Sequence, residues 1–487
     1  MLHPKSIARI LGHLLTILGC AMALPLVMAA ARGESEVLAA ILLPESIALV
    51  AGLALSYAYR DASRQISQRD GMLAVLAGWV CASLLGALPY LLSGILTSPI
   101  SALFESVSSF TTTGATVLRD LSVLPSSLLM WRSFSQWLGG LAILVLIRSL
   151  MPAAFSGSSS ILQSGTPEIN TDSLSFSPKS AARMLYFAYI GMTAAQAALL
   201  RLAGLSAFDS VLFSFSTAAS GGLTGYSDGL LHVGTPAVEA ILAVFMVLSC
   251  VNFTAYMHIF RRSSDKLRQS TELKAYFAFL AAGILLVSVN LWTSGTYARM
   301  GQALRFGGFQ AVSFMTTTGL ASADYTVWPT FSKCLMSILS FIGGCTSSTG
   351  GALKVIRVVI LAKMVWRSFT TRIHPSAVVT IKVNQKPLPS QIANSVVSYT
   401  LIFFAIFLTG AFLLSFDALD FETAFHTASA MLCNVGSTFG ETGIFGCCDM
   451  FGGFSKLVMC FLMLAGRLEI YAVLLPFSRS FRSDKSY

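Results

Sequence analysis

Charged residues are scarce in this chain of 487 residues, because Asp, Glu, Lys and Arg together make up only 11% of it. In soluble domains roughly a quarter of all residues are charged. Hydrophobic residues make up 55% of the chain, and the mean hydropathy is +0.72. A soluble domain of this length would need far more polar surface. The scarcity of charge therefore excludes an ordinary soluble protein and predicts a protein embedded in a lipid bilayer.

Short enzyme motifs are also lacking. The six histidines and the many serines form no HExxH or GxSxG pattern, and the chain has no P-loop for a nucleotide phosphate. No pair of the nine cysteines has CxxC spacing, although Cys447 and Cys448 are adjacent. We therefore expect no enzymatic activity, no zinc site and no covalently bound cofactor.

The net charge of +10 does not indicate a nucleic-acid-binding protein. Basic residues occur in short runs between apolar stretches, in segments 60–69, 261–268 and 357–386. This distribution is typical of the cytoplasmic loops of a membrane protein. Nucleic-acid binding would require a soluble basic face with interleaved aromatic residues, which the sequence does not contain. We expect no nucleic-acid partner.

Apolar stretches long enough to cross a bilayer predict about ten transmembrane spans. The stretch that follows Lys5 and Arg9 could resemble a signal peptide, but it is long enough to span, so we interpret it as a retained first helix. With the N-terminus inside, alternation places every basic run and the C-terminal tail on the cytoplasmic side. The predicted spans are 8–31, 37–59, 71–95, 126–150, 182–203, 235–260, 275–294, 330–361, 394–415 and 454–477.

An internal repeat is the most informative feature of the sequence. Between alternate spans lie apolar segments too short to cross, each of which ends in a cluster of small and polar residues around a glycine. These glycines are separated by 108, 97 and 117 residues, and a small residue precedes each by six positions. Each repeat is therefore predicted to be a span, a short helix with a loop, and a second span. The glycines are Gly114, Gly222, Gly319 and Gly436.

The residue types in these four loops suit the coordination of a monovalent cation. Irregular backbone at membrane depth persists only where it is buried in protein or lines water. Glycine permits a positive φ, so successive carbonyls can point inward and replace the hydration shell of potassium. The alternative, in which small residues only pack helices together, does not explain four matched clusters. The predicted filter residues are Thr112, Thr113, Gly114, Ser220, Gly221, Gly222, Thr317, Thr318, Gly319, Asn434, Val435 and Gly436.

The eighth span contains a Gly-rich segment, 343–351, that should not form a stable helix. We expect it to unwind beneath the loops and face the conduction path, although a close helix crossing is the alternative. Arg467 lies inside the last span, where a charge costs about 2.5–3.5 kcal/mol, so it must face the interior. The predicted gate comprises Gly343, Gly344, Cys345, Thr346, Ser347, Ser348, Thr349, Gly350, Gly351 and Arg467.

Four stretches of this chain resemble the Trk/Ktr/HKT superfamily of potassium transporters, and most strongly the membrane subunits of bacterial Trk systems. They are 110–116, 316–325, 343–357 and 466–469. The resemblance covers essentially the whole chain and implies a homodimer, a cytosolic nucleotide-binding regulatory subunit (TrkA) as partner, and a gating role for segment 343–351 and Arg467. It also implies potassium rather than sodium, because Gly114 replaces the serine of sodium-preferring relatives. Two departures are Ser437, where relatives usually carry proline, and Ser220, where an aliphatic residue is common.

These observations predict an all-α polytopic membrane protein of about ten transmembrane helices, with four pseudo-fourfold helix–pore loop–helix repeats around one pore. The expected function is gated, moderately selective potassium uptake across the bacterial inner membrane, with both termini cytoplasmic. A potassium symporter coupled to protons or sodium is the alternative, although few ionisable residues, such as Glu105 and His426, could serve it. The expected divisions are a helix pair at 1–62 and repeats at 63–155, 156–265, 266–372 and 373–487.

Overall fold

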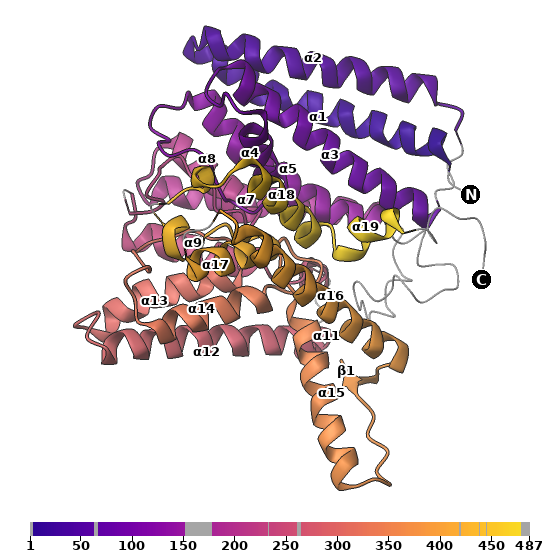
Figure 1. Ribbon diagram of the computed structural model, residues 1–487, viewed down its shortest axis with the longest axis vertical. Coiled ribbons are helices and arrows are strands. Elements are labelled where there is room, and N and C mark those ends of the chain that lie inside the picture. The colour runs from indigo at the N-terminus through magenta and orange to yellow at the C-terminus, as the bar shows by residue number, and fades with distance from the viewer. Residues whose placement is uncertain are drawn as a thin grey trace.

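The structure is a computed structural model, and it is almost entirely helical (Figure 1). The sheet consists of one antiparallel pair of two-residue strands, β1 (Lys382–Val383) and β2 (Lys386–Pro387). The predicted all-α class is therefore confirmed. The residues that the structure describes are 3–62, 67–150, 178–231, 233–260, 264–417, 420–437, 439–444 and 446–478.

The first two helices, α1 (Pro4–Arg32) and α2 (Ser35–Ala58), form an antiparallel pair at one side of the molecule (Figure 1). Their backbones approach closely at two glycines. A Cβ on Gly12 would lie 2.7 Å from the Ser56 backbone nitrogen, and one on Gly52 would lie 2.6 Å from that of Thr16. Small residues at such contacts let membrane helices pack without a hydrophobic driving force.

The rest of the chain follows the predicted repeat of a long helix, a short helix with a loop, and a second long helix. Repeats 1 and 2 comprise α3 (Gln68–Leu92), α4 (Pro99–Phe110), α5 (Ser126–Leu150), α7 (Pro178–Leu202), α8 (Ala207–Ala218), α9 (Pro236–Ser249) and α10 (Phe253–Phe260). Repeat 3 comprises α11 (Ser264–Gln269), α12 (Thr271–Thr293), α13 (Met300–Met315), α14 (Thr330–Ile342) and α15 (Val355–Ile373). Repeat 4 comprises α16 (Ser390–Leu414), α17 (Phe421–Cys433), η2 (Gly440–Thr442), η3 (Cys448–Met450), α18 (Gly453–Arg467), α19 (Ile470–Leu474) and η4 (Leu475–Phe477).

The four short helices, α4, α8, α13 and α17, are 12, 12, 16 and 13 residues long. About 20 residues are needed to cross a bilayer, so each ends partway through it. Side-chain caps fix the start of three of them. Ser98 and Ser206 accept hydrogen bonds from backbone amides of the first turn, and Asp420 accepts one from the Thr423 amide at 2.8 Å.

Six helices in the described part of the chain, α1, α2, α3, α7, α12 and α16, are long and apolar enough to cross a membrane unbroken. The other predicted spans correspond to α5, which has 25 residues, and to three interrupted helices. The eighth span breaks as predicted, over residues 343–354. The prediction of continuous sixth and tenth spans was wrong, because these break at 250–252 and 468–469.

The break in the sixth span has a tertiary cause. The Phe253 amide, which would bond within a continuous helix, instead donates to the Ser347 carbonyl of the Gly-rich segment at 3.1 Å. Asn252 Oδ1 accepts from the Thr254 amide at 2.9 Å and thereby caps the new helix. No glycine or proline marks this break in the sequence, so periodicity alone could not reveal it.

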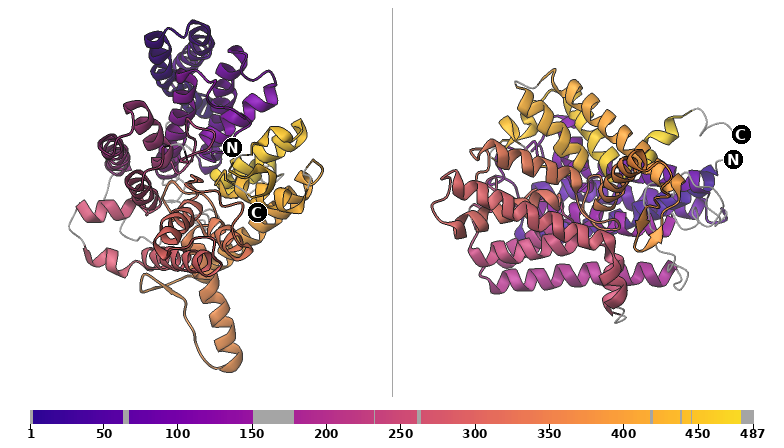
Figure 2. Two further views of the ribbon diagram at one scale, coloured as in Figure 1. Left: turned by 90° about the vertical axis from the view of Figure 1, so that its left-hand side faces the viewer. Right: turned by 90° about the horizontal axis from the view of Figure 1, so that it is seen from below.

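Helix α15 leaves the bundle after its first turn and projects beyond it (Figures 1 and 2). Its buried residues Ile356 and Ile360 pack with Val383 of the β1–β2 hairpin and Val396 of α16. The rest of the helix is largely exposed. The basic segment at its end therefore stands away from the helical body.

Candidate functional site

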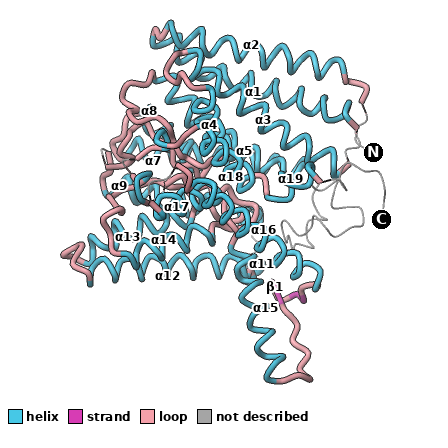
Figure 3. The backbone as a smooth tube through the Cα atoms, viewed as in Figure 1, coloured by secondary structure: helices cyan, strands magenta, loops and turns pink. Residues whose placement is uncertain are grey.

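Four loops that follow the short helices converge in the middle of the molecule, where Figure 3 shows loop segments between the ends of α4, α8 and α17. We number them loop 1 (112–116), loop 2 (220–224), loop 3 (317–321) and loop 4 (434–437). Each has positive φ at its first residue and again two residues later, at its glycine. The first residues are Thr112, Ser220, Thr317 and Asn434, with φ between 53° and 55°, and the glycines are the four predicted ones, with φ between 74° and 85°.

The loops fit together as a closed ring. A Cβ placed on any of the four glycines would collide with a backbone carbonyl oxygen of another loop. Only glycine fits such a position, for both its space and its positive φ. The contacts run in chain order and return to the start: Gly114 meets the carbonyl of Gly221, Gly222 that of Thr318, Gly319 that of Val435, and Gly436 that of Thr113. The structure thus brings the four loops, which contain all twelve predicted filter residues, into one ring.

Serine hydroxyl groups of the preceding short helices donate equivalent hydrogen bonds to loops 1 and 3. Ser108 Oγ donates to the Ala115 carbonyl at 2.5 Å, and Ser313 Oγ donates to the Leu320 carbonyl at 2.6 Å. These two serines are the small residues found six positions before the glycine. The same bracing does not extend to the other two loops, because Ser216 Oγ has no hydrogen-bond partner in the described residues and the equivalent residue before Gly436 is Ala430.

The threonines of the two TTTG clusters also pair with each other. The Oγ1 atoms of Thr111 and Thr113 lie 2.8 Å apart, and those of Thr316 and Thr318 lie 2.9 Å apart. A hydroxyl in such a loop can coordinate an ion or brace the loop through a hydrogen bond. The observed contacts assign bracing to these four side chains.

Loop 2 lacks the TTTG pattern and is held by an amide side chain instead. Gln136 of α5 donates from Nε2 to the Gly221 carbonyl at 2.7 Å and accepts from the Leu223 amide at 3.3 Å. Gln136 is fully buried. The sequence reasoning missed it, although a glutamine within an apolar span was a usable signal.

A buried ion pair contacts loops 1 and 2. Arg132 of α5 donates from Nε to Glu105 of α4 at 2.8 Å, and neither side chain is more than 1% exposed. Glu105 also accepts from the Thr116 hydroxyl and the Val117 amide, while Arg132 reaches the Thr224 carbonyl at 3.2 Å. A carboxylate therefore supports the ring, although the loops themselves contain none.

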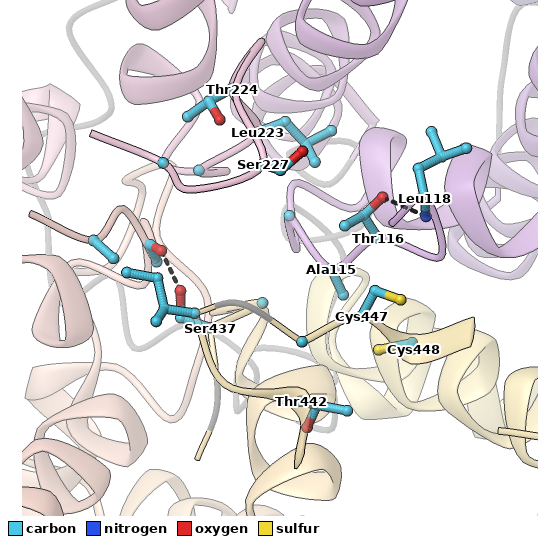
Figure 4. A pocket seen from close by; sticks show the side chains of 18 of the residues that line it. Ala115, Thr116, Leu118, Leu223, Thr224, Ser227, Ser437, Thr442, Cys447 and Cys448 are labelled. Atoms are coloured by element: carbon cyan, nitrogen blue, oxygen red, sulfur yellow. Dashed lines mark hydrogen bonds between the residues drawn. The ribbon is translucent and has the colours of Figure 1, made fainter. Parts of the chain in front are cut away.

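A cavity of about 380 Å³ opens above the ring (Figure 4). Residues of all four loops line it, together with residues 441–444 and 446–448 of the segment after loop 4. Cys447 and Cys448 lie in this wall as free thiols. The Cys448 amide donates to the Thr116 carbonyl at 2.8 Å, which joins repeat 4 to repeat 1.

The Gly-rich segment lies directly against the ring on the other side. The Gly351 amide donates to Thr317 Oγ1 at 2.8 Å, and a Cβ on Gly351 would collide with the Cys433 carbonyl. A Cβ on Gly350 would lie 3.5 Å from the Thr316 carbonyl. The predicted unwinding beneath the loops is what the structure contains.

A carboxylate fixes the beginning of the Gly-rich segment. Glu272, at the start of α12, accepts from the Thr346 amide at 2.6 Å and from the Thr346 hydroxyl at 2.9 Å. The preceding residue, Thr271, exchanges two hydrogen bonds with Asn384 in the β1–β2 hairpin, at 2.8 and 3.0 Å. The hairpin therefore contacts the same helix end that holds the segment.

Two positively charged side chains, those of Arg467 and Lys354, donate hydrogen bonds to the end of the Gly-rich segment. Arg467 Nη1 donates to the Thr349 carbonyl at 2.5 Å, and Lys354 Nζ donates to the Gly350 carbonyl. Arg467 is 4% exposed, and its Nε and Nη2 atoms have no protein hydrogen-bond partner in the described part of the chain. The predicted inward position of Arg467 is therefore observed, at the C-terminal end of α18.

The sequence groups Arg357 with the basic residues of segment 357–386, but its side chain does not lie at the surface. Arg357 is fully buried at the start of α15, where its Nη2 donates to Glu469 at 2.7 Å and its guanidinium lies 3.8 Å from the Tyr399 ring centroid. Glu469 thus pairs with Arg357 and not with its near neighbour in the chain, Arg467. The break at 468–469 directs it there.

Comparisons with known proteins identify the family of this chain. The family model TrkH, described as a cation transport protein, matches residues 40–487. The Trk system potassium uptake protein TrkH of Halomonas elongata is 33% identical over 98% of this chain and 99% of its own length. The corresponding protein TrkG of Escherichia coli is 32% identical, with the same coverage.

A solved structure is also similar over nearly the full length. The crystal structure of the potassium transporter TrkH from Vibrio parahaemolyticus matches with a TM-score of 0.89 and 29% identity, covering 98% of this chain and 99% of that one. The resemblance drawn from the four sequence stretches is confirmed. The chain belongs to the TrkH family of cation transport proteins.

Proposed function

We propose that this chain is a potassium uptake protein of the bacterial inner membrane that conducts K⁺ through the ring of four loops. The observation that carries the proposal is the closed ring of glycines, each packed against a carbonyl of the next loop. Such rings of carbonyl oxygens replace the hydration shell of potassium. Relatives named as Trk system potassium uptake proteins support the choice of ion.

In this proposal the filter is built from the twelve residues of the ring, and K⁺ is the transported ion. Backbone dipoles supply the field, because the hydroxyls of Thr113 and Thr318 are engaged in bracing the loops. Divalent cations prefer carboxylate ligands. The only carboxylate that contacts loop 1 in the described residues, Glu105, is paired with Arg132 behind the ring.

The Gly-rich segment 343–351 and Arg467 form the gate in this proposal. The segment lies across the inner side of the ring, and Arg467 brings an unneutralised guanidinium to its Thr349 carbonyl. A buried positive charge beside the path raises the energy of a passing cation. Opening requires the segment to leave its contacts with Arg467, Lys354 and Glu272.

Downhill flux is sufficient for uptake. The membrane potential contributes about 2.3 kcal/mol per unit charge for every 100 mV. The symport alternative requires a coupling group near the bilayer centre. Glu105 is neutralised by Arg132, and His426 packs against Phe439 at 4.8 Å between ring centroids. Uptake that depends on a proton or sodium gradient at clamped voltage would favour symport.

The remaining assignments concern assembly. We infer a homodimer with both termini cytoplasmic and a TrkA-like nucleotide-binding subunit on the cytoplasmic face. The projecting helix α15 and the hairpin after it support that docking surface, because they carry basic residues away from the body (Figure 2). The proposed divisions remain 1–62, 63–155, 156–265, 266–372 and 373–487. The boundary at 155/156 and the basic residues Arg479, Arg482 and Lys485 lie outside the described residues.

The test of the function is rescue of a bacterium that lacks potassium uptake. Expression of this chain with its partner subunit should restore growth at low external potassium, and purified protein in liposomes should pass K⁺. A Gly114→Ala variant, expressed to the same level, is the matched control and should not rescue. Failure of the wild-type chain to rescue, with verified membrane expression, would contradict the proposal.

A further inference from the structure

The ring of loops departs from fourfold symmetry at one hydroxyl. Ser437 directly follows the glycine of loop 4, whereas the equivalent positions of loops 1, 2 and 3 are Ala115, Leu223 and Leu320. Loop 4 is thus the only loop with a hydroxyl at this position. The difference lies next to the glycines on which the ring depends.

The Ser437 hydroxyl reaches across to the neighbouring loop. Its Oγ donates a hydrogen bond to the Gly319 carbonyl, and both residues line the cavity above the ring (Figure 4). The Ser437 amide donates to the Val435 carbonyl of its own loop at 2.9 Å. A Cβ on Gly319 would lie 3.2 Å from the nitrogen and from Oγ of Ser437. Loops 3 and 4 therefore meet at this side chain.

Aromatic packing fixes the segment that carries the hydroxyl. Phe439, two residues on, stacks on Phe314 of α13 with ring centroids 5.4 Å apart and meets Tyr325 edge-on at 5.4 Å. Both partners belong to repeat 3. The segment after loop 4 is thus anchored to the same repeat that supplies the Gly319 carbonyl, so the hydroxyl is held close to its acceptor.

A hydrogen bond to a carbonyl oxygen changes how that oxygen acts on an ion. The donated proton occupies a lone pair and reduces the negative potential that the oxygen presents. Ligands of weaker field favour the larger, more weakly hydrated K⁺ over Na⁺. A single engaged carbonyl among four would therefore alter ion preference more than it alters the passage of ions in general.

We propose that Ser437 is a specificity-determining residue, which weakens the field of the Gly319 carbonyl and thereby shifts the ring toward K⁺ over Na⁺. It acts through Gly319 as a positioning residue. The inference rests on the proposed function, because it assumes that the ring conducts cations. It adds one residue that the fourfold pattern of the sequence does not contain.

The test is the K⁺-to-Na⁺ permeability ratio of the full-length protein in liposomes, measured alongside the K⁺ flux itself. Ser437→Ala should lower the ratio about threefold, in line with the loss of one hydrogen bond. Ser437→Thr keeps the donor and should retain the wild-type ratio. Ser322→Ala removes a buried hydroxyl just after loop 3 that has no hydrogen-bond partner in the described part of the chain, and it should leave the ratio unchanged.

Two results would overturn the inference. One is a Ser437→Ala protein that conducts K⁺ with the wild-type ratio. The other is a Ser437→Thr protein whose K⁺-to-Na⁺ permeability ratio falls about threefold, as expected for the alanine variant. This second result can be measured even if the alanine variant does not fold. If liposomes that contain the wild-type protein pass no K⁺, the proposed function is overturned, and this inference with it.

Discussion

The ring of four loops and the Gly-rich segment beneath it are built on different physical principles. The ring is assembled from neutral groups, and the same backbone pattern occurs four times, with each glycine against a carbonyl of the next loop. The segment occurs once and is bound by charged side chains, Glu272 at its beginning and Lys354 and Arg467 at its end.

We propose that this contrast separates a fixed filter from a gate that can change state. Close contacts between backbones leave the ring a single arrangement, because interiors are packed without spare space. Contacts between long charged side chains and the polar groups of Thr346, Thr349 and Gly350 can be exchanged for water or for other partners. The ring is therefore suited to recognise an ion, and the segment is suited to change state.

Removing a ring glycine should have the largest effect. Gly319→Ala would place a methyl group against the Val435 carbonyl at a position with positive φ, so we expect K⁺ flux in liposomes to fall at least about tenfold. Gly191→Ala in α7 is the matched control, since a Cβ there meets nothing within 4 Å. Normal flux through the Gly319 variant would show that the ring is not tightly closed.

Breaking the ion pair behind the ring should lower stability. Arg132→Met leaves the buried Glu105 carboxylate unpaired, and we expect a loss of about 3–5 kcal/mol, measured as a lower unfolding temperature in detergent. The double variant that combines Arg132→Met with Glu105→Gln should recover part of the lost stability. Equal unfolding temperatures for the single variant and the wild type would contradict a structural role for the pair.

Removing the guanidinium at the proposed gate should raise cation flux. Arg467→Ala takes away the charge at the Thr349 carbonyl, so cation flux in the absence of any partner should rise severalfold. Arg32→Ala, at the exposed end of α1, is the control for loss of an arginine. Unchanged flux through the Arg467 variant in reconstituted vesicles would contradict the barrier role.

Weakening the other end of the segment should have the smallest effect. Glu272→Gln keeps one acceptor for Thr346 but removes the charge, and we expect about a twofold rise in basal flux. Glu36→Gln on the exposed start of α2 is the control. A Glu272 variant that conducts like the wild type would show that Lys354 and Arg467 hold the segment without the Glu272 charge.

Much of the site could be predicted from residue types that repeat. The four glycines and their preceding small residues recur at similar intervals, so the four loops could be recognised from the sequence. The unwinding of 343–351 followed from its glycine content. The inward position of Arg467 followed from the cost of exposing a charge to lipid.

Contacts between distant residues were not predictable in this way. Arg357 looks like one of many basic residues after a span, and only its burial beside Glu469 and Tyr399 distinguishes it. The break before Phe253 is marked by no glycine or proline in the sequence. It depends instead on a contact between repeats, since the Phe253 amide donates to the carbonyl of Ser347, which lies in another repeat.

The sequence by itself determined that this chain is a membrane protein with four matched loops, because scarcity of charge and positions that require glycine are local properties of the residues. Only the tertiary structure decided that the loops close into one ring in chain order, that Glu105 and Arg132 neutralise each other behind it, and that Ser437 bonds to Gly319. Those features join atoms from different repeats, and their energies depend on distances that no local pattern encodes.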